Sequence, residues 1–365
     1  MKKVFLNRFQ KLYPPKKNHQ DVINQWVIRA HQQSSQLTKA SFDLEKLKKY
    51  LISSEDIHTR YSFCLDVDRN WEDSDIYRLC DQSPYGATIK ERADYFQNQA
   101  LNCIKNFYQE ATLLPQHLIH VTCTGYISPS APQVYFADVE KAPAITHAYH
   151  MGCYASLPAV RLGQSLVSSE QFQNVDLIHT EMCSLHMQPQ IHTAEQMIVQ
   201  SLFADGTIKY QISDESADDS FELLFVHEKL IPNSSKDMTW ISAPYGMQMS
   251  LTRDVPTKIA LGLDGFIQAI CQKLNLGWDE LKANSLFAIH PGGPKILDLT
   301  SELLQLQPEQ IQASYEILKE HGNMSSATLP HIWQRLLTIP KNKKYVLSMA
   351  FGPGLTIFGS VMKRI

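Results

Sequence analysis

Three residues suited to nucleophilic or hydrogen-bonding chemistry stand at expected element ends in this sequence of 365 residues: Cys153, His290 and Asn323. Cys153 follows Gly152 at a predicted junction between a strand and a helix, where the positive end of a helix dipole favours a thiolate. His290 ends a predicted buried strand and precedes Pro-Gly-Gly-Pro, whose glycines allow a substrate to approach closely. Asn323 follows a predicted helix. A nucleophile, a histidine and an amide at three separate element ends are typical of a catalytic site assembled by folding.

Each of these residues also has a plain structural explanation. A cysteine at such a corner is often a packed core residue. A histidine beside prolines and glycines belongs to ordinary turn chemistry, and Gly-Asn after a helix is a frequent C-cap. Only the combination of the three therefore favours catalysis.

The composition is that of a globular protein with a large core, because 44% of the residues are apolar and 19% are charged. The net charge is −3 and no basic stripe is present, which argues against a nucleic-acid partner. No apolar run approaches the roughly 20 residues of a membrane-spanning helix. The N-terminal apolar run is too short for a signal-peptide core, so we expect a cytoplasmic protein. Seven cysteines without a CxxC pair argue against disulfides and a metal site.

The periodicity of apolar residues predicts an α/β fold with two similar halves, residues 1–215 and 216–365. The acidic stretch 213–220 marks the expected midpoint. The first half carries the cysteine, and the second carries the histidine and the asparagine. Predicted strands lie at 4–9, 117–123, 145–151, 175–183, 285–290 and 344–351, with a strand pair over 197–212 that turns at Asp205-Gly206. Predicted helices lie at 21–32, 38–51, 88–108, 154–168, 256–274, 295–306, 308–321 and 325–337.

Several motifs match one family. They are Met-Gly-Cys-Tyr around Cys153, His-Pro-Gly-Gly-Pro-Lys-Ile-Leu-Asp from His290, and Gly-Asn-Met-Ser-Ser from Gly322, together with stretches 202–206, 251–256 and 351–356. With these motifs the chain resembles the type III polyketide synthases, the chalcone-synthase-like branch of the thiolase superfamily. The resemblance implies a thiolase-like fold in which two similar α/β halves pack in layers (αβαβα). It also implies that the protein is an acyltransferase and that it forms a homodimer.

The resemblance further implies a mechanism. A Cys153 thiolate paired with protonated His290 takes the starter acyl group. His290 and Asn323 then bind the malonyl thioester carbonyl and stabilise the enolate that forms when carbon dioxide leaves. The carbanion attacks the acyl group on Cys153, and pyrones or resorcinols result. Acyl-CoA and malonyl-CoA are the substrates, and no cofactor is needed.

The resemblance also points to pocket residues. Phe203 matches the first gatekeeping phenylalanine of the plant enzymes, whereas Met249 replaces the second, and His186 replaces a small hydroxyl residue. A flexible methionine predicts a pocket of different shape. The remaining predicted substrate contacts are Gly292, Gly293, Ser325, Gly352 and Gly354.

Lys48, Lys49 and Arg60 are the predicted contacts of the coenzyme A phosphates. The neighbouring residues 53–56 are neutral to acidic, so thioesters of an acyl carrier protein stay open as substrates. Three other functions also stay open. One is a single condensation like that of ketoacyl synthase III, which uses the same three residues. The others are a non-catalytic, acyl-binding partner subunit and a cysteine hydrolase.

Overall fold

The structure is a computed structural model that describes residues 2–111 and 113–365. Nine strands form one sheet in the order β11-β12-β13-β8-β1-β7-β6-β4-β5. Their bounds are β1 Phe5–Leu12, β4 His117–Thr122, β5 Ala144–Tyr149, β6 Asn174–Met182, β7 Asp205–Ser213, β8 Phe221–Leu230, β11 Ser285–Ile289, β12 Tyr345–Gly352 and β13 Thr356–Arg364. Two further pairs are β2 (Lys16–His19) with β3 (Thr59–Ser62), and β9 (Met238–Ala243) with β10 (Gly246–Leu251).

The helices cover and separate two wings of this sheet. Their bounds are α1 Gln20–Thr38, α2 Leu44–Lys48, α3 Ile89–Tyr108, α4 Ala131–Phe136, α5 Ser156–Ser168, α6 Ala194–Leu202, α7 Val255–Leu274, α8 Trp278–Ala283, α9 Pro294–Leu304, α10 Pro308–His321 and α11 Thr328–Leu337. None of the helices in the described ranges is long and apolar enough to cross a membrane.

Strand β1 joins the two wings. It pairs with β7 from Phe5 to Leu12, but with β8 only at Phe5 and Leu6. One wing is therefore β7-β6-β4-β5, and the other is β8-β13-β12-β11. The expected boundary at 215/216 falls in the connection between β7 and β8, and the division into two halves stays a prediction.

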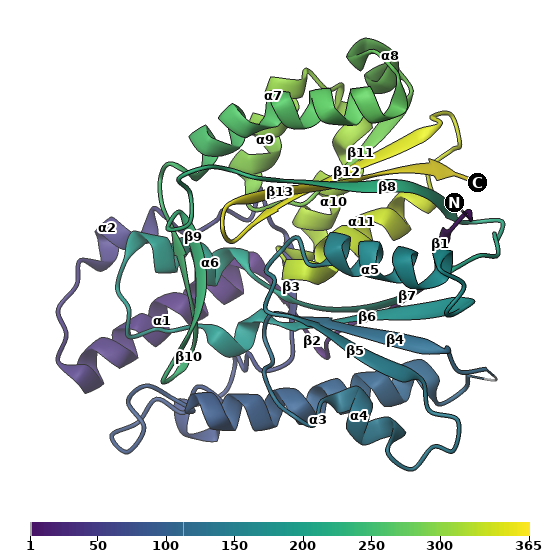
Figure 1. Cartoon of the computed structure of the whole chain (residues 1–365). Coiled ribbons are helices and arrows are strands. Elements are labelled where there is room, and N and C mark those ends of the chain that lie inside the picture. Colours follow the sequence, from purple (N-terminus) through teal and green to yellow (C-terminus); the bar gives the residue numbers. More distant parts are fainter. Residues whose placement is uncertain (1, 112) are drawn as a thin grey trace.

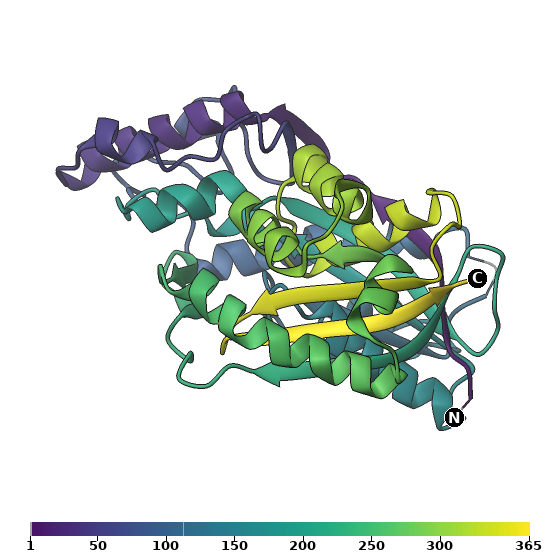
Figure 2. The same cartoon turned by 90° about the horizontal axis from the view of Figure 1, so that it is seen from above.

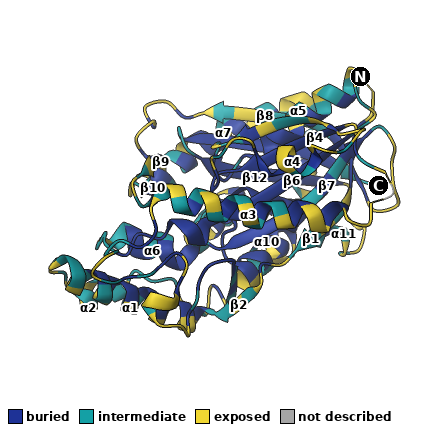
Figure 3. Ribbon diagram, turned by 90° about the horizontal axis from the view of Figure 1, so that it is seen from below, coloured by how far each residue is buried: buried dark blue, intermediate teal, exposed yellow. Residues whose placement is uncertain are grey.

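The elements stack in five layers (Figure 1). Helices α7 and α8 lie outside the second wing, α5, α10 and α11 lie between the wings, and α3 and α4 lie outside the first wing. From above, the green helix α7 crosses the yellow strands β12 and β13 (Figure 2). The strands are mostly buried, whereas α3 presents an exposed face (Figure 3). The predicted layered α/β fold is confirmed.

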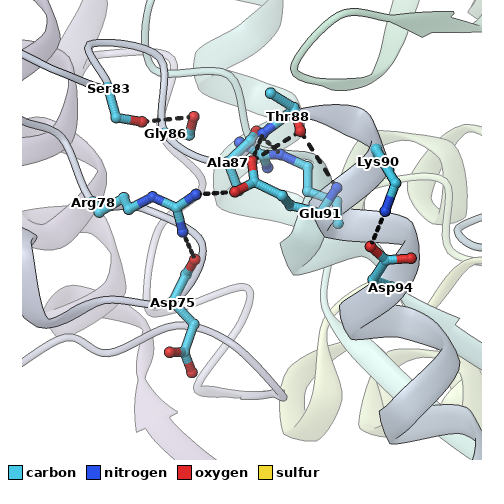
Figure 4. Close-up of polar contacts among 10 residues, drawn as sticks. Asp75, Arg78, Ser83, Gly86, Ala87, Thr88, Lys90, Glu91 and Asp94 are labelled. Carbon is cyan, nitrogen blue, oxygen red and sulfur yellow. Dashed lines mark hydrogen bonds and ion pairs between the residues drawn. The ribbon is translucent and has the colours of Figure 1, made fainter.

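Helix α3 shows how local sequence sets an element. Thr88 forms a capping box with Glu91: the Thr88 backbone amide donates to the Glu91 carboxylate at 2.7 Å, and the Glu91 amide donates to Thr88 Oγ1 at 3.4 Å. Arg78 adds an ion pair to Glu91 (Figure 4). The predicted helix at 88–108 is confirmed within one residue.

Two predicted elements are wrong. Residues 38–51 do not form one helix, because α1 ends at Thr38 with Lys39 in the left-handed conformation, and α2 is short. Residues 197–212 are not a strand pair, because α6 fills 194–202 and β7 begins at Asp205. The Asp205 carboxylate accepts the backbone amides of Phe63 and Ser184, both at 2.7 Å, so it anchors the start of a strand rather than a hairpin turn.

Candidate active site

One cavity of about 400 Å³ brings the three reactive candidates together. Cys153, His290 and Asn323 all line it, although they follow β5, β11 and α10 respectively. Phe203, Met249, Gly292 and Gly293, which the sequence also predicted, line the same cavity.

Cys153 lies in a turn that leads into α5, which begins three residues later at Ser156. Gly152 makes the corner possible with a φ of +79°, and a Cβ there would lie 2.4 Å from Cδ of Pro353. The loop after β12 therefore packs directly against the residue before the sulfur. Any other residue at 152 would displace either the nucleophile or this loop.

The pKa of Cys153 departs from the sequence-based expectation. Burial raises the pKa of the thiol to about 12, and hydrogen bonds from the Ser325 and Asn323 side chains lower it by less. Desolvation outweighs those donors and therefore opposes the thiolate that the sequence predicts at this helix N-terminus.

His290 follows β11 and is held by its backbone, whose amide donates to the Met349 carbonyl of β12 at 2.8 Å. Burial lowers the pKa of its imidazole to about 3, which favours the neutral ring over the imidazolium that the sequence predicts. Neither ring nitrogen has a hydrogen-bond partner within the described residues. An unpartnered buried imidazole is costly, and here its nitrogens adjoin the cavity that holds the thiol.

Asn323 is oriented by contacts on both its backbone and its side chain. Its Oδ1 accepts the Ser325 backbone amide at 2.9 Å, which leaves the side-chain NH₂ as a donor. Its backbone forms a short parallel bridge with Phe203, in which the Asn323 amide donates to Leu202 O at 3.0 Å and the Ala204 amide donates to Asn323 O at 2.8 Å. Helix α10 ends at His321 and Gly322 is its C-cap, so Asn323 is not the cap residue.

A small separate space lies beside the thiol. Cys153, Ser325, Phe203 and Met249 surround a space of about 20 Å³, to which Trp240 also contributes. Met249 on β10 stands opposite Trp240 on β9. Sequence reasoning missed Trp240 because it did not predict the β9–β10 hairpin.

Another cavity, of about 250 Å³, is lined by His186, Thr124 and Tyr126. Nε2 of His186 donates to Thr124 O at 2.8 Å, and Nδ1 accepts the Met247 amide at 3.0 Å, so its tautomer is fixed. Trp240 stands edge-on to His186, and its Nε1 donates to Cys123 O at 2.7 Å. His186 thus forms the wall of this cavity rather than of the one that holds His290.

Of the three residues predicted to contact the coenzyme A phosphates, only one lines the main cavity. Lys49 lines the mouth of the main cavity, whereas Lys48 pairs with Glu45 at 2.6 Å and is absent from the cavity lining. Arg60 is only 2% exposed and donates to three protein acceptors, so its predicted contact with coenzyme A is wrong. Lys295, at the start of α9, lines the mouth instead.

The C-terminal glycine loop contacts the site through its other residues. Phe351 lines the main cavity and Pro353 the small space beside the thiol, whereas Gly352 and Gly354 line neither. Gly352 packs against Tyr154, because a Cβ there would lie 2.4 Å from Cδ1 of the ring.

Glu181 at the end of β6 ties the site loops together. Its buried carboxylate accepts the Cys123 amide at 3.0 Å, the Thr124 hydroxyl at 3.0 Å and the Ser326 amide at 3.3 Å. Burial raises the pKa of this carboxyl group. The loop that contains Ser325 and the end of β4 are therefore fixed to one another.

Comparisons with known proteins agree with the motifs. Residues 222–365 match the family model "Chalcone and stilbene synthases, C-terminal domain". The chain is 28% identical over 256 residues to the probable polyketide synthase 1 of Dictyostelium discoideum, covering 68% of this chain but only 8% of that much longer protein. It is 26% identical over 298 residues to type III polyketide synthase C of Arabidopsis thaliana, covering 76% of this chain and 77% of the relative.

A solved structure has the same fold. The C-terminal type III polyketide synthase domain of Steely1, a type I/III hybrid from Dictyostelium, superimposes with a TM-score of 0.84 at 23% identity. The match covers 100% of this chain and 99% of that one.

Proposed function

We propose that this chain is an acyl-condensing enzyme of the type III polyketide synthase family, which loads an acyl starter on Cys153 and extends it with malonyl-CoA. The match of residues 222–365 to the chalcone and stilbene synthase model and the similarity to two polyketide synthases support this proposal. The observation that supports this most directly is the shared cavity of Cys153, His290 and Asn323, in which the imidazole nitrogens have no partner among the described residues. A thiol, a base and an amide donor are the groups that acyl loading and decarboxylative condensation require.

Loading begins from neutral groups. As the Cys153 sulfur attacks the thioester carbonyl, its proton passes to His290, whose lowered pKa keeps the ring unprotonated and ready to accept it. The tetrahedral intermediate collapses, the bond to the coenzyme A sulfur breaks, and the imidazolium returns the proton to that sulfur. The product is an acyl thioester on Cys153 and free coenzyme A.

Extension uses the two donors. The Asn323 side-chain NH₂ and a His290 N–H bind the carbonyl oxygen of the malonyl thioester. Loss of carbon dioxide places the electron pair on the enolate, which those donors stabilise, and one such donor is typically worth about 10²–10³ in rate. The enolate carbon attacks the acyl carbonyl, and the Cys153 thiolate leaves. Apolar Phe203 and Met249 flank the reacting groups and favour loss of the charged carboxylate.

The mouth of the cavity suits a phosphorylated carrier. Lys49 and Lys295 both line it, and we assign them to the phosphates of coenzyme A, with an acyl-carrier-protein arm as the alternative. A cytoplasmic homodimer with N- and C-terminal halves meeting at 215/216 completes the proposal. Pyrones or resorcinols are the proposed products.

The test is to incubate the protein with acyl-CoA and malonyl-CoA and to analyse both the protein and the products by mass spectrometry. We expect an acyl adduct on Cys153 and cyclised products of several extensions, and both should disappear in Cys153→Ala. A 3-ketoacyl thioester as the sole product would instead support the single-condensation alternative. No adduct in the wild type would refute acyl loading.

A further inference from the structure

Arg60 on β3 is a buried cation whose counter-charge, the Asp205 carboxylate, acts on it without a direct contact. Its side chain forms no ion pair within residues 2–111 and 113–365, and burial lowers its pKa to about 9, so it stays protonated at pH 7. Its donors serve neutral oxygens: Nε donates to Gln20 Oε1 at 2.8 Å, and Nη1 donates to Gln200 O at 2.9 Å and Phe203 O at 2.6 Å. Burying a charge in this way is expensive, which implies a role worth that cost.

The role concerns the C-terminal end of α6. The last carbonyls of a helix lack intrahelical partners, and here four successive ones are all satisfied from outside. Arg60 donates hydrogen bonds to the carbonyls of residues 200 and 203. Gln20 Nε2 donates to Ser201 O at 2.7 Å, and the Asn323 backbone amide donates to Leu202 O at 3.0 Å. A cation at this end also complements the helix dipole.

These contacts link Arg60 to both sides of the cavity. Phe203 O is bound directly, and Phe203 is the bridge partner of Asn323. The aliphatic part of Arg60 packs on Gly322, where a Cβ would lie 3.0 Å from both Cγ and Cδ. The guanidinium therefore holds Phe203, one residue of the bridge. The aliphatic part of the Arg60 side chain contacts Gly322, which directly precedes Asn323, the other residue of the bridge.

We propose that Arg60 is a positioning residue for the extension step. It holds Phe203 and, through the backbone bridge, the side-chain amide of Asn323 in the positions that contact the bound malonyl group. This inference rests on the proposed function. Only a guanidinium has a planar fork that can bind Gln20 and two helix-end carbonyls together. A lysine keeps the charge but replaces the fork with a compact ammonium, and a methionine keeps only the packing volume.

The test separates the two chemical steps. In Arg60→Lys and Arg60→Met we would measure malonyl-CoA decarboxylation and, independently, the rate of Cys153 acylation by intact-protein mass spectrometry. We expect kcat for decarboxylation to fall about tenfold in the lysine variant and about 100-fold in the methionine variant, as misplaced catalytic groups do. The acylation rate should fall far less, about twofold, because Asn323 contributes to that step only a hydrogen bond to the Cys153 thiol.

A matched control comes from Arg364, which also binds carbonyls just after a helix. Its Nη2 donates to Ile339 O at 2.6 Å and its Nη1 to Pro340 O at 3.1 Å, beyond the end of α11. None of these residues lines the cavity. Arg364→Met should lower the melting temperature yet leave both rates unchanged.

A second readout tests the link to Asn323 itself. If Arg60 acts through Asn323, Asn323→Ala should cost much less decarboxylation in the Arg60→Lys background than in the wild type. Fully additive losses, or equal losses of acylation and decarboxylation, would overturn the role of Arg60 while leaving the proposed function intact. A wild-type protein that neither acylates nor decarboxylates would overturn both.

Discussion

Mild acid should unfold this protein, because it buries many histidines in neutral form. Burial is the first cause that lowers the pKa of seven of them, to values from about 2 to about 4: His31, His120, His179, His186, His290, His321 and His331. In the unfolded chain each would titrate near 6.5. At a pH between the folded pKa values and 6.5, the unfolded chain binds protons that the folded protein does not. The free energy of unfolding is therefore highest above pH 6.5 and decreases as the pH falls.

The magnitude follows from this difference. One unit below the unfolded pKa, each such histidine costs roughly 1.4 kcal/mol. Seven of them therefore cost roughly 10 kcal/mol at about pH 5.5, which is comparable to the 5–15 kcal/mol that stabilises a typical domain. Asp205 opposes the trend, because burial raises its pKa to about 6 and its protonation stabilises the fold in acid. Its full contribution is roughly 3 kcal/mol and develops mostly below pH 6, so it offsets only a part.

The assay is a series of calorimetric melting curves from pH 8 to pH 5 at constant ionic strength. We expect little change down to about pH 7 and a steep fall in melting temperature towards pH 5.5. His120→Gln is a suitable check, because His120 bonds to Tyr149 and Thr180 and lies outside the cavity lining. This variant should take up about one proton fewer on unfolding. A melting temperature that is flat between pH 7 and pH 5.5 would refute the reasoning.

Three substitutions test the site. Asn323→Asp keeps the acceptor for the Ser325 amide but removes the NH₂ donor, so malonyl-CoA decarboxylation should fall about 10²–10³-fold; unchanged decarboxylation would exclude Asn323 as an enolate ligand. Trp240→Ala should join the spaces of about 20 and 250 Å³, so longer starters or products should appear by mass spectrometry, and an unaltered product range would contradict this. Glu181→Gln leaves a buried donor unpaired and should cost about 1–3 kcal/mol in urea unfolding; wild-type stability would show that the network is dispensable.

The sequence located the reactive residues because each stands at an element end within a distinctive motif. Asn323 directly follows Gly322, and His290 lies two residues before Gly292, so the glycines that close approach requires are visible in the sequence. The cavity that gathers them with Cys153 is consistent with that prediction.

Other features depend on partners distant in the sequence. The sequence predicts Arg60 as a coenzyme A contact beside Lys48 and Lys49, but its backbone acceptors belong to residues 200 and 203, which only folding brings near. The apolar residues of 197–212 fit a strand or a helix equally well, and the cap at Thr193, which accepts the Gln196 amide, decides for the helix. The raised pKa of the Cys153 thiol likewise reflects burial by several elements, which no local motif reports.

Strand β1 has a consequence for how the chain is made. Residues 5–12 pair with residues 207–213, and Phe5 and Leu6 also meet residues 221 and 222. During synthesis from the N-terminus, strand β1 has no strand to pair with until some 200 further residues have been added. Contacts so distant along the chain slow folding and leave apolar edges open to aggregation. The two wings therefore cannot be joined through β1 before most of the polypeptide has left the ribosome.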